Sequence, residues 1–579
     1  MLHLSSRGKR SKTNRCTLRA IVIQIALFTL AFAAAVKAQG VEAPPVTSFR
    51  PDSSSLPKMD VPEFVVTGKA ETELQKAEKP SVEIDSSYFQ GKNIHGLDID
   101  VLAGQSLTQG LGNSGGRPSL FARLSLGTYA TTSYLVSGGG EVSDYQLNGS
   151  LSGDYTSGFM PYTIQRSFAV QGVVTKEFDL DQDTKTGNSL DLGYSRDSYF
   201  LYGSNFPDID QLRTTNQFNL RIRSDITLGE LPVMAGLKFD RFSSLDYSDG
   251  VQSTFGFNLG TSLQLPYGSL ELNGDFEFGE HTISSAFTGP QPVSIPYVNS
   301  FSHSLYNINV GAAYSNGFDL VTYSVGLNYY QYTDDLSSTI AKLYPDLRGV
   351  YRLNDRVSLF GRFYGAVRSQ NLSEIFSTDR YVDNSLALRN TQDYADFTIG
   401  GNVALSSEVS VTPDVRIQAL RYYPVFQTAP NLFTPDNQLD YANKATIFTT
   451  SVTAKYKRDQ FSADAVLNLR LDSADSLSYI PNLSPFDLTL DAGYEISPQF
   501  LASASLVFLS GRHSDLLSDE KLDPSWLLNL RLSYDLQIQQ IPLEIFAEGK
   551  NLLDQKYFIW QGYREFPFTL SIGISSRIL

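Results

Sequence analysis

The segment YQLNGSLSGDY, residues 145–155, decides the fold of this chain. Its side chains alternate strictly between two kinds. Tyr145, Leu147, Leu151 and Tyr155 share one face with two glycines, while small polar or acidic residues occupy the other. A period of two places these sets on opposite faces of a β-strand. The segment therefore predicts a strand with one apolar face and one polar face.

The same alternation recurs along the chain, for example at Phe461–Asp472 and Trp526–Leu536. A soluble β-sandwich alternates too, but its strands average about 5–6 residues. The three runs are eleven or twelve residues long. Charged residues make up only 18% of the chain, aromatic residues 12%, and there are 43 glycines. This composition favours a sheet with one face in lipid and the other in water.

The connections between these runs alternate in length. Short turns are predicted at 141–144, 266–268, 315–317, 354–355, 406–408, 457–459 and 497–499. Longer links are predicted between them, for example at 281–300, 369–394 and 426–444. Short turns at one end and long loops at the other are typical of an outer-membrane barrel. We predict an all-β fold, a transmembrane antiparallel β-barrel of about 22 strands over residues 118–579, preceded by a short, mostly irregular N-terminal segment.

The first residues predict an exported protein. A basic stretch precedes an apolar run at 20–36, so residues 1–38 are predicted to be a signal peptide. Residues 39–60 are rich in Pro and Ser and are predicted to be a disordered linker. Removing residues 1–38 would take away Cys16, the only cysteine, and seven basic residues, moving the net charge from −15 to −22. That charge argues against nucleic acid as a partner.

Four stretches together resemble one family, the TonB-dependent outer-membrane receptors. NLLDQKYF (551–558) resembles the signature before the family's last strand, and FTLSIGISSRI (568–578) resembles the closing strand itself. AVRSQNLSEIF (366–376) is similar to the start of a mid-barrel loop, and EFVVTGKA (63–70) to the segment that pairs with TonB. The family usually ends on an aromatic residue, where this chain has Ile578 and one further residue.

The resemblance implies a location and partners. It implies the outer membrane of a Gram-negative-type bacterium, with outer-membrane lipid, the barrel-assembly machinery, and TonB or another periplasmic protein as partners. The residues implied to pair with TonB are Glu63, Phe64, Val65, Val66, Thr67 and Gly68. The residues implied to face lipid and serve as the barrel-assembly signal are Leu570, Ile572, Ile574 and Ile578.

The resemblance also exposes a difference. The family carries a plug domain of well over a hundred residues inside its barrel, whereas only residues 71–117 separate the TonB-like run from the first expected strand. No Pro-Gly-Val or Ile-Arg-Gly stretch occurs there. Residues 61–117 are therefore predicted to hold the TonB-like run and a reduced plug. Either residues 71–117 would form a partial stopper, or the long loops would fold inward.

Three functions remain open at this point. The first is a plugless receptor-like barrel that transports a small hydrophilic solute. The second is a passive, porin-like channel, and the third is an envelope-assembly barrel that a partner protein fills or docks on. Loop aromatics Tyr557, Trp560 and Tyr563 either belong to the interfacial aromatic girdle or face a ligand.

The sequence gives no sign of an enzyme, a cofactor or a metal site. No histidine has a neighbour at metal-ligand spacing, and no Gly-rich phosphate loop opens a helix. His281, His303 and His513 are expected in or near solvated loops. We therefore predict no catalytic residues, no bound metal and no cofactor.

Overall fold

The structure is a computed structural model that describes residues 119–181, 184–202, 212–229, 231–246, 248–285, 300–427, 437–475, 479–515, 521–539 and 541–578. The predicted signal peptide (1–38), linker (39–60) and reduced plug with its TonB-like run (61–117) lie outside these residues.

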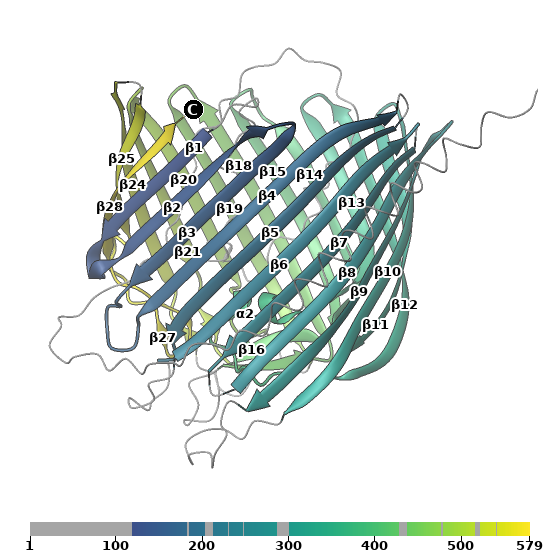
Figure 1. Cartoon of the computed structure of the whole chain (residues 1–579), viewed down its shortest axis with the longest axis horizontal. Helices are drawn as coiled ribbons and strands as arrows, with labels where there is room; N and C mark the ends of the chain where they lie inside the picture. Colours follow the sequence, from purple (N-terminus) through teal and green to yellow (C-terminus); the bar gives the residue numbers. More distant parts are fainter. Residues whose placement is uncertain are drawn as a thin grey trace, which may run out of the picture. The chain divides into compact units, whose positions relative to one another are not determined.

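Twenty-two antiparallel strands form one closed sheet (Figure 1). β1 (Ser119–Gly127) pairs with β2 (Thr132–Val142) on one side and with β28 (Thr569–Ile578) on the other, the latter through eight residue pairs. Because the first and last barrel strands pair, the sheet has no free edge. The predicted barrel and its strand number are confirmed.

The other barrel strands follow in chain order. They are β3 (Tyr145–Thr156), β4 (Gln165–Asp181), β5 (Thr184–Phe200), β6 (Leu212–Leu228), β7 (Leu231–Leu245), β8 (Ser248–Leu265), β9 (Gly268–Ser285), β10 (Phe301–Phe318), β11 (Val321–Asp334), β12 (Ser337–Asn354), β13 (Val357–Arg368), β14 (Thr391–Ala404), β15 (Val409–Arg421), β18 (Ala445–Arg458), β19 (Phe461–Ala474), β20 (Phe486–Ser497), β21 (Phe500–Leu509), β24 (Ser525–Ile538) and β25 (Ile541–Lys550).

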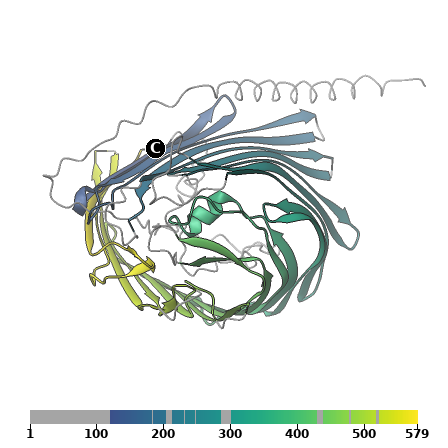
Figure 2. The same cartoon turned by 90° about the horizontal axis from the view of Figure 1, so that it is seen from below.

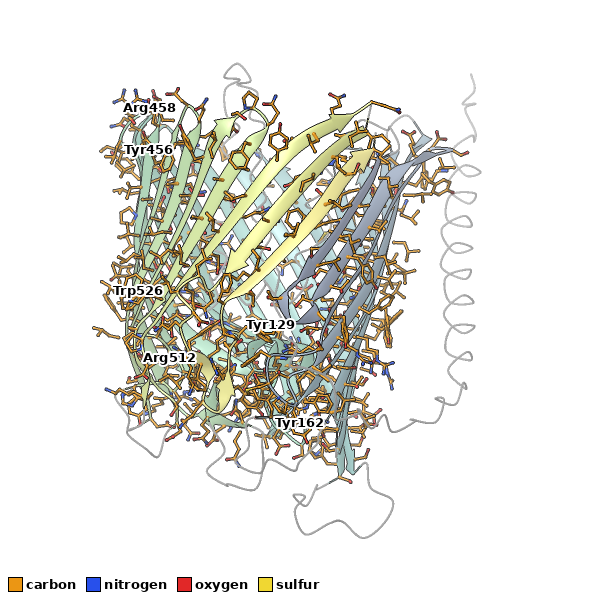
Figure 3. The ribbon with its side chains drawn as sticks, turned by 90° about the vertical axis from the view of Figure 1, so that its left-hand side faces the viewer. Tyr129, Tyr162, Tyr456, Arg458, Arg512 and Trp526 are labelled. Atoms are coloured by element: carbon orange, nitrogen blue, oxygen red, sulfur yellow. The ribbon has the colours of Figure 1, made fainter. Side chains whose placement is uncertain are left out.

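The two faces of the sheet divide as the alternation predicts. On β3, Tyr145, Leu147 and Leu151 are exposed outward, while Ser150 between them is buried. On β24, Trp526 and Tyr534 are both exposed on the outer face, 43% and 44%. Eight residues of a tilted strand separate them, a height of about 20 Å. Figure 3 shows Trp526 and Tyr456 at two different heights of the wall. These aromatics mark the two edges of an apolar band.

The two ends of the barrel differ. One end carries both termini of the barrel and is here called the short-turn end. Its described turns are as short as Ser143-Asp144, where both residues take positive φ. Such a turn matches the twist of the flanking strands. The opposite end is here called the long-loop end, and its connections include residues 369–390 and 551–568.

Two predicted turn positions are wrong by a few residues. The turn predicted at 315–317 lies inside β10, and the chain reverses at Asp319-Leu320 instead. Asn316-Gly317 is a strong turn signal by itself, but pairing with β9 and β11 continues past it. Likewise the predicted link from 281 is shorter, because β9 continues to Ser285. His281 is therefore a buried strand residue and not a solvated loop residue.

Candidate functional site in the mouth of the barrel

One loop folds into the barrel at its long-loop end. Residues 369–390, here called the mouth loop, connect β13 to β14 and contain α2 (Leu372–Thr378). Figure 2, seen from the long-loop end, shows α2 inside the ring of strands. The side chain of Asn371 caps the helix by accepting a hydrogen bond from the N–H of Glu374 at 2.8 Å. Asn371 therefore fixes the first turn of α2 inside the lumen.

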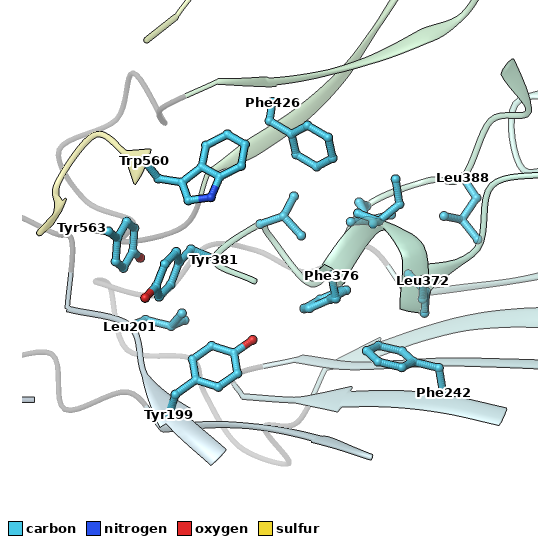
Figure 4. Close-up of a cluster of buried hydrophobic side chains, with 13 residues drawn as sticks. Tyr199, Leu201, Phe242, Leu372, Phe376, Tyr381, Leu388, Phe426, Trp560 and Tyr563 are labelled. Carbon is cyan, nitrogen blue, oxygen red and sulfur yellow. The ribbon is translucent and has the colours of Figure 1, made fainter. Parts of the chain in front are cut away.

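The mouth loop is the centre of a buried apolar cluster that joins distant parts of the chain. The cluster is drawn in Figure 4 and consists of Tyr199, Leu201, Phe242, Leu372, Ile375, Phe376, Tyr381, Val382, Leu386, Leu388, Phe426, Trp560 and Tyr563. The Tyr381 and Tyr563 rings stack with their centroids 3.5 Å apart. Full burial of one such side chain is worth about 1.5–3 kcal/mol. The cluster therefore holds the mouth loop against β5, β7 and two other loops.

A buried arginine fastens the mouth loop to the wall. Arg213 on β6 is fully buried and forms an ion pair with Asp246, Nη2 to Oδ2 at 2.6 Å. Its Nη1 donates to the backbone carbonyls of Arg380 and Val382 at 3.0 and 2.6 Å. The hydroxyl of Tyr199 donates to the same Arg380 carbonyl at 2.6 Å. Planar guanidinium donors suit this role because one side chain serves an acid and two carbonyls at once.

Strands β7 and β8 receive the mouth loop through further buried bonds. The amide of Asn384 donates to the carbonyls of Ser244 and Ser248 at 2.6 and 2.9 Å. The N–H of Leu372 donates to Gln252 at 2.6 Å. Gly250 makes the approach possible, because a Cβ there would stand 3.1 Å from the Asn384 carbonyl oxygen and 2.8 Å from its side-chain oxygen. The wall is shaped for this loop.

The end of β11 and the turn after it hold the end of the mouth loop through two carboxylates, Asp334, which accepts from the N–H of Asn390 at 2.9 Å, and Asp335. Asp335, in the tight turn after β11, accepts a hydrogen bond from the N–H of Leu388 at 2.7 Å and returns one from its own N–H at 3.1 Å. The same carboxylate meets Nδ1 of the buried His281 at 2.5 Å and lies 3.4 Å from Nδ1 of His303. The mouth loop is therefore bonded to β6–β8 and also to the end of β11 and the turn that follows it.

A hairpin from the next loop covers the mouth loop. β16 (Tyr423–Gln427) and β17 (Gln438–Ala442) pair with each other. Asn437, just before β17, donates its N–H to the carbonyl of Tyr381 at 2.9 Å, and its side chain donates to Asp379 at 2.8 Å. The hairpin and the mouth loop form one hydrogen-bonded layer across the mouth.

One acid in this layer and one in the loop at 551–568 have raised pKa values, so their ionisation is disfavoured. Asp379 is fully buried, and burial raises its pKa to about 7, although hydrogen bonds from Asn437 and Tyr381 lower it. Burial likewise raises the pKa of Glu565 to about 7, with the nearby charge of Arg380 opposing the shift. A buried carboxylate loses hydration, so the neutral form gains.

The wall below the mouth is polar and largely self-neutralised. On β12 and β13, Asp346 accepts hydrogen bonds from Nη2 of Arg348 at 2.6 Å and of Arg362 at 3.0 Å. On β14 and β15, Arg416 and Asp396 form an ion pair at 2.5 Å. Paired charges present polar atoms to the lumen at little net charge. Such a wall suits water and hydrophilic solutes.

The structure treats the predicted site residues unequally. Glu63–Gly68 lie outside the described residues. Leu570, Ile572, Ile574 and Ile578 are exposed on the outer face of β28, and their role in assembly stays a prediction. Trp560 and Tyr563 are buried in the apolar cluster at 6% and 1% exposure, and Tyr557 is half-buried. Ligand contact by these three aromatics stays a prediction for a state with an open mouth.

The sequence did not single out Arg213, Asp246, Asn384 or Asp335. In the sequence of a barrel strand or turn, a polar residue that faces water in the lumen looks the same as one that binds a loop.

Among the described residues, no helix is both long and apolar enough to cross a membrane. Within the same residues, no group of three or more His, Cys, Asp or Glu side chains is arranged to hold a metal ion.

The sequence matches no protein-family model and no curated protein. Solved structures do match. The copper transporter OprC has a TM-score of 0.62 at 12% identity, covering 80% of both chains. The FrpB iron transporter from Neisseria meningitidis (F3-3 variant) has a TM-score of 0.61 at 11% identity, covering 82% of this chain and 83% of its own.

A third similar structure is the siderophore receptor PiuA from Acinetobacter baumannii, with a TM-score of 0.59 at 11% identity, covering 80% of this chain and 82% of its own. Identities this low make the likeness one of fold. The fold is that of the barrels of TonB-dependent outer-membrane receptors, as the sequence resemblance implied.

Proposed function

We propose that this chain transports a small polar solute across an outer membrane, through a barrel whose extracellular mouth is closed by its own loops. The observation that carries the proposal is the mouth loop, which is bonded to β6–β8 and to the end of β11 with its following turn, and is covered by the β16–β17 hairpin. Long loops face the cell exterior in outer-membrane barrels. The closure therefore stands on the side from which a solute would arrive.

The lumen argues for a transported solute that is polar. A barrel of 22 strands encloses a lumen that conducts unless something fills it. The wall residues below the mouth are paired ions and small polar groups. Support also comes from the similar structures, whose titles name a copper transporter, an iron transporter and a siderophore receptor. The solute itself is left as a class, small and hydrophilic.

Removing the mouth loop tests the proposal. We would replace residues 371–388 with a short Gly-Ser linker and record single-channel conductance of the mature protein in a planar bilayer. The parent protein should be mostly closed, and the variant should show a steady conductance on the scale of an open porin, because a 22-stranded lumen is wider than that of a porin of 16–18 strands. Deleting residues 39–117 in the loop variant as well shows whether that segment adds a second barrier.

The alternatives predict different traces. A passive, porin-like channel would conduct steadily in the parent protein and change little in either variant. A barrel filled or docked by a partner protein would stay closed in the loop variant only when the partner is added. A variant that stays closed without any partner, while its barrel is folded, would contradict closure by the mouth loop.

Energy coupling is a separate part of the proposal and rests on the sequence of residues 63–68. We propose that this run adds a strand to a sheet edge of TonB's C-terminal domain, with main-chain hydrogen bonds supplying the affinity. A peptide of residues 58–75 should bind that domain. The Val65→Pro peptide lacks one main-chain donor, so its binding should weaken about fivefold or more. Lack of binding by the unaltered peptide would remove TonB coupling but leave gated transport standing.

A further inference from the structure

Three outward-facing arginines gather on neighbouring strands of one side of the barrel. They are Arg166 on β4, Arg196 on β5 and Arg241 on β7, and all three are exposed. Each stands directly opposite an aromatic residue of the adjacent strand. The pairs are Arg166 with Tyr155, Arg196 with Phe168, and Arg241 with Phe218.

The register places these arginines close together. Arg196 lies opposite Phe168, two residues from Arg166 on the same strand, so Arg166 and Arg196 are diagonal neighbours at about 7–8 Å between Cα atoms. Arg196 also lies opposite Asn216, two residues from Phe218, the partner of Arg241. With one strand between β5 and β7, Arg196 and Arg241 stand about 10–12 Å apart. We call these three residues the arginine patch.

The arginine patch lies at the outer edge of the apolar band. Arg241 is ten residues beyond the start of β7 at the short-turn end, and Arg196 is twelve beyond the start of β5. At the usual strand rise and tilt these positions are about 25–30 Å above that end. The apolar band of such barrels is about 25 Å tall. The guanidinium groups therefore meet the headgroups of the outer leaflet, where an exposed arginine costs little.

The positive charge of the arginine patch is only partly offset by the protein around it. In the described part of the chain, none of the three arginines is in an ion pair within 4.0 Å. Arg166 lies over the Tyr155 ring at 5.5 Å, and Arg241 donates to the hydroxyl of Ser253 at 3.2 Å. Asp249 on β8 interacts electrostatically with Arg241. The chain as a whole carries a net charge of −15, so a cationic surface of this kind is unusual for it.

We propose that the arginine patch binds the phosphate groups of a phosphorylated lipid of the outer leaflet. Guanidinium groups hold phosphate oxygens through two parallel hydrogen bonds. The aromatic residues opposite each arginine offer an apolar surface for the acyl chains just below the phosphates. Basic residues clustered at a membrane surface are the sequence-readable form of anionic lipid recognition. The proposal depends on the barrel's place in an outer membrane and is independent of solute transport.

Native mass spectrometry of the full-length barrel with added lipopolysaccharide tests this site. The parent protein should retain bound lipid. Each of Arg166→Gln, Arg196→Gln and Arg241→Gln should weaken binding about fivefold, and the triple variant about a hundredfold. Enzymatically dephosphorylated lipopolysaccharide should bind the parent as weakly as the intact lipid binds the triple variant. Inorganic phosphate should not compete at millimolar concentration, since a lipid anchor and not a free anion is the ligand.

Two matched controls test whether the loss of lipid binding is specific to the arginine patch. Arg421→Gln removes an exposed arginine on β15, away from the patch, that lies 5.6 Å from the ring centroid of Tyr394 on β14. Lys176→Gln removes a cation on β4, near the short-turn end, that lies over the ring of Tyr145 on β3. Both should leave lipid binding unchanged. The proposal is overturned if a folded triple variant binds as the parent does, if either control weakens binding as much, or if free phosphate displaces the lipid.

Discussion

Replacing Arg213 with alanine should release the mouth loop while leaving the barrel folded. Arg213 is fully buried, and so is its partner Asp246. Removing one partner of a buried ion pair costs about 3–5 kcal/mol, because the other charge stays buried without compensation. The carbonyls of Arg380 and Val382 also lose their donor. The ratio of closed to open mouth should fall roughly a hundredfold to a few thousandfold, since about 1.4 kcal/mol is a factor of ten.

Two measurements detect that release. Hydrogen exchange of the amides in residues 371–390 should accelerate, while exchange in the barrel strands stays as in the parent. Single-channel conductance should show frequent openings. Arg223→Ala is the matched control, because Arg223 lies on the same strand and pairs with Asp225, but both side chains are more than half exposed. Exposed pairs contribute about 0–1 kcal/mol, so that variant should behave as the parent.

A different outcome would locate the closure elsewhere. If Arg213→Ala leaves exchange of the mouth loop unchanged, the apolar cluster alone holds the loop. Phe376→Ala would then be the sharper variant, since Phe376 is 6% exposed and packs on Phe242 with ring centroids 5.3 Å apart. Truncating a buried phenylalanine costs about 3–5 kcal/mol. Failure of both variants to loosen the loop would remove its role as a gate.

The barrel could be predicted from sequence because its pattern is local. The two-residue period of Tyr145–Tyr155 is visible without knowing any partner strand, and it recurs in strands such as β19 and β24. Turn positions are harder to predict from sequence, because Asn316-Gly317 has the chemistry of a turn yet pairs with strands on both sides within β10. Pairing of whole strands outweighs the preference of two residues.

The mouth loop could not be placed in the same way. Its contacts join residues far apart in the sequence, such as Arg213 with Val382 and Asn384 with Ser244. No period or spacing encodes such contacts. The inward folding of a long loop was one of two expected alternatives, and only the geometry distinguishes the mouth loop as the one that closes. For Trp560 and Tyr563, the sequence showed two aromatics in a loop but not which way they turn.

Closure of the mouth should weaken as the pH rises from about 4 to about 7. The pKa of Asp379 is raised by burial to about 7 in the closed layer and returns toward its ordinary value of 3.8 when the loop is released into water. The closed state thus binds the proton more tightly than the open state. Its extra stability is fully present below the open-state pKa and is lost as the pH rises through the closed-state pKa. Each pKa unit is worth about 1.4 kcal/mol, so a shift of this size moves the open fraction by orders of magnitude.

The groups around Asp379 determine how sharply this appears. Asn437 and the N–H of Tyr381 donate to its carboxylate, and the charges of Arg213 and Arg380 favour its ionised form. Asp379→Asn removes the titrating group and can keep the bond to Asn437 with that amide turned over. The open fraction of this variant, measured by conductance between pH 4 and 8, should vary less with pH and be lower at pH 8 than in the parent. Glu565→Gln should remove the remaining dependence.

Asp523→Asn provides the matched control, because it exchanges an exposed loop carboxylate for the same amide. Its conductance should follow the pH as the parent's does. A parent whose open fraction falls as the pH rises would reverse the sign and show that the closed layer favours the ionised acid. An Asp379→Asn variant that keeps the full pH dependence would instead assign the titration to another group. Either result would show that protonation of Asp379 does not stabilise the closed mouth. The apolar cluster and Arg213 would then remain as the contacts that close it.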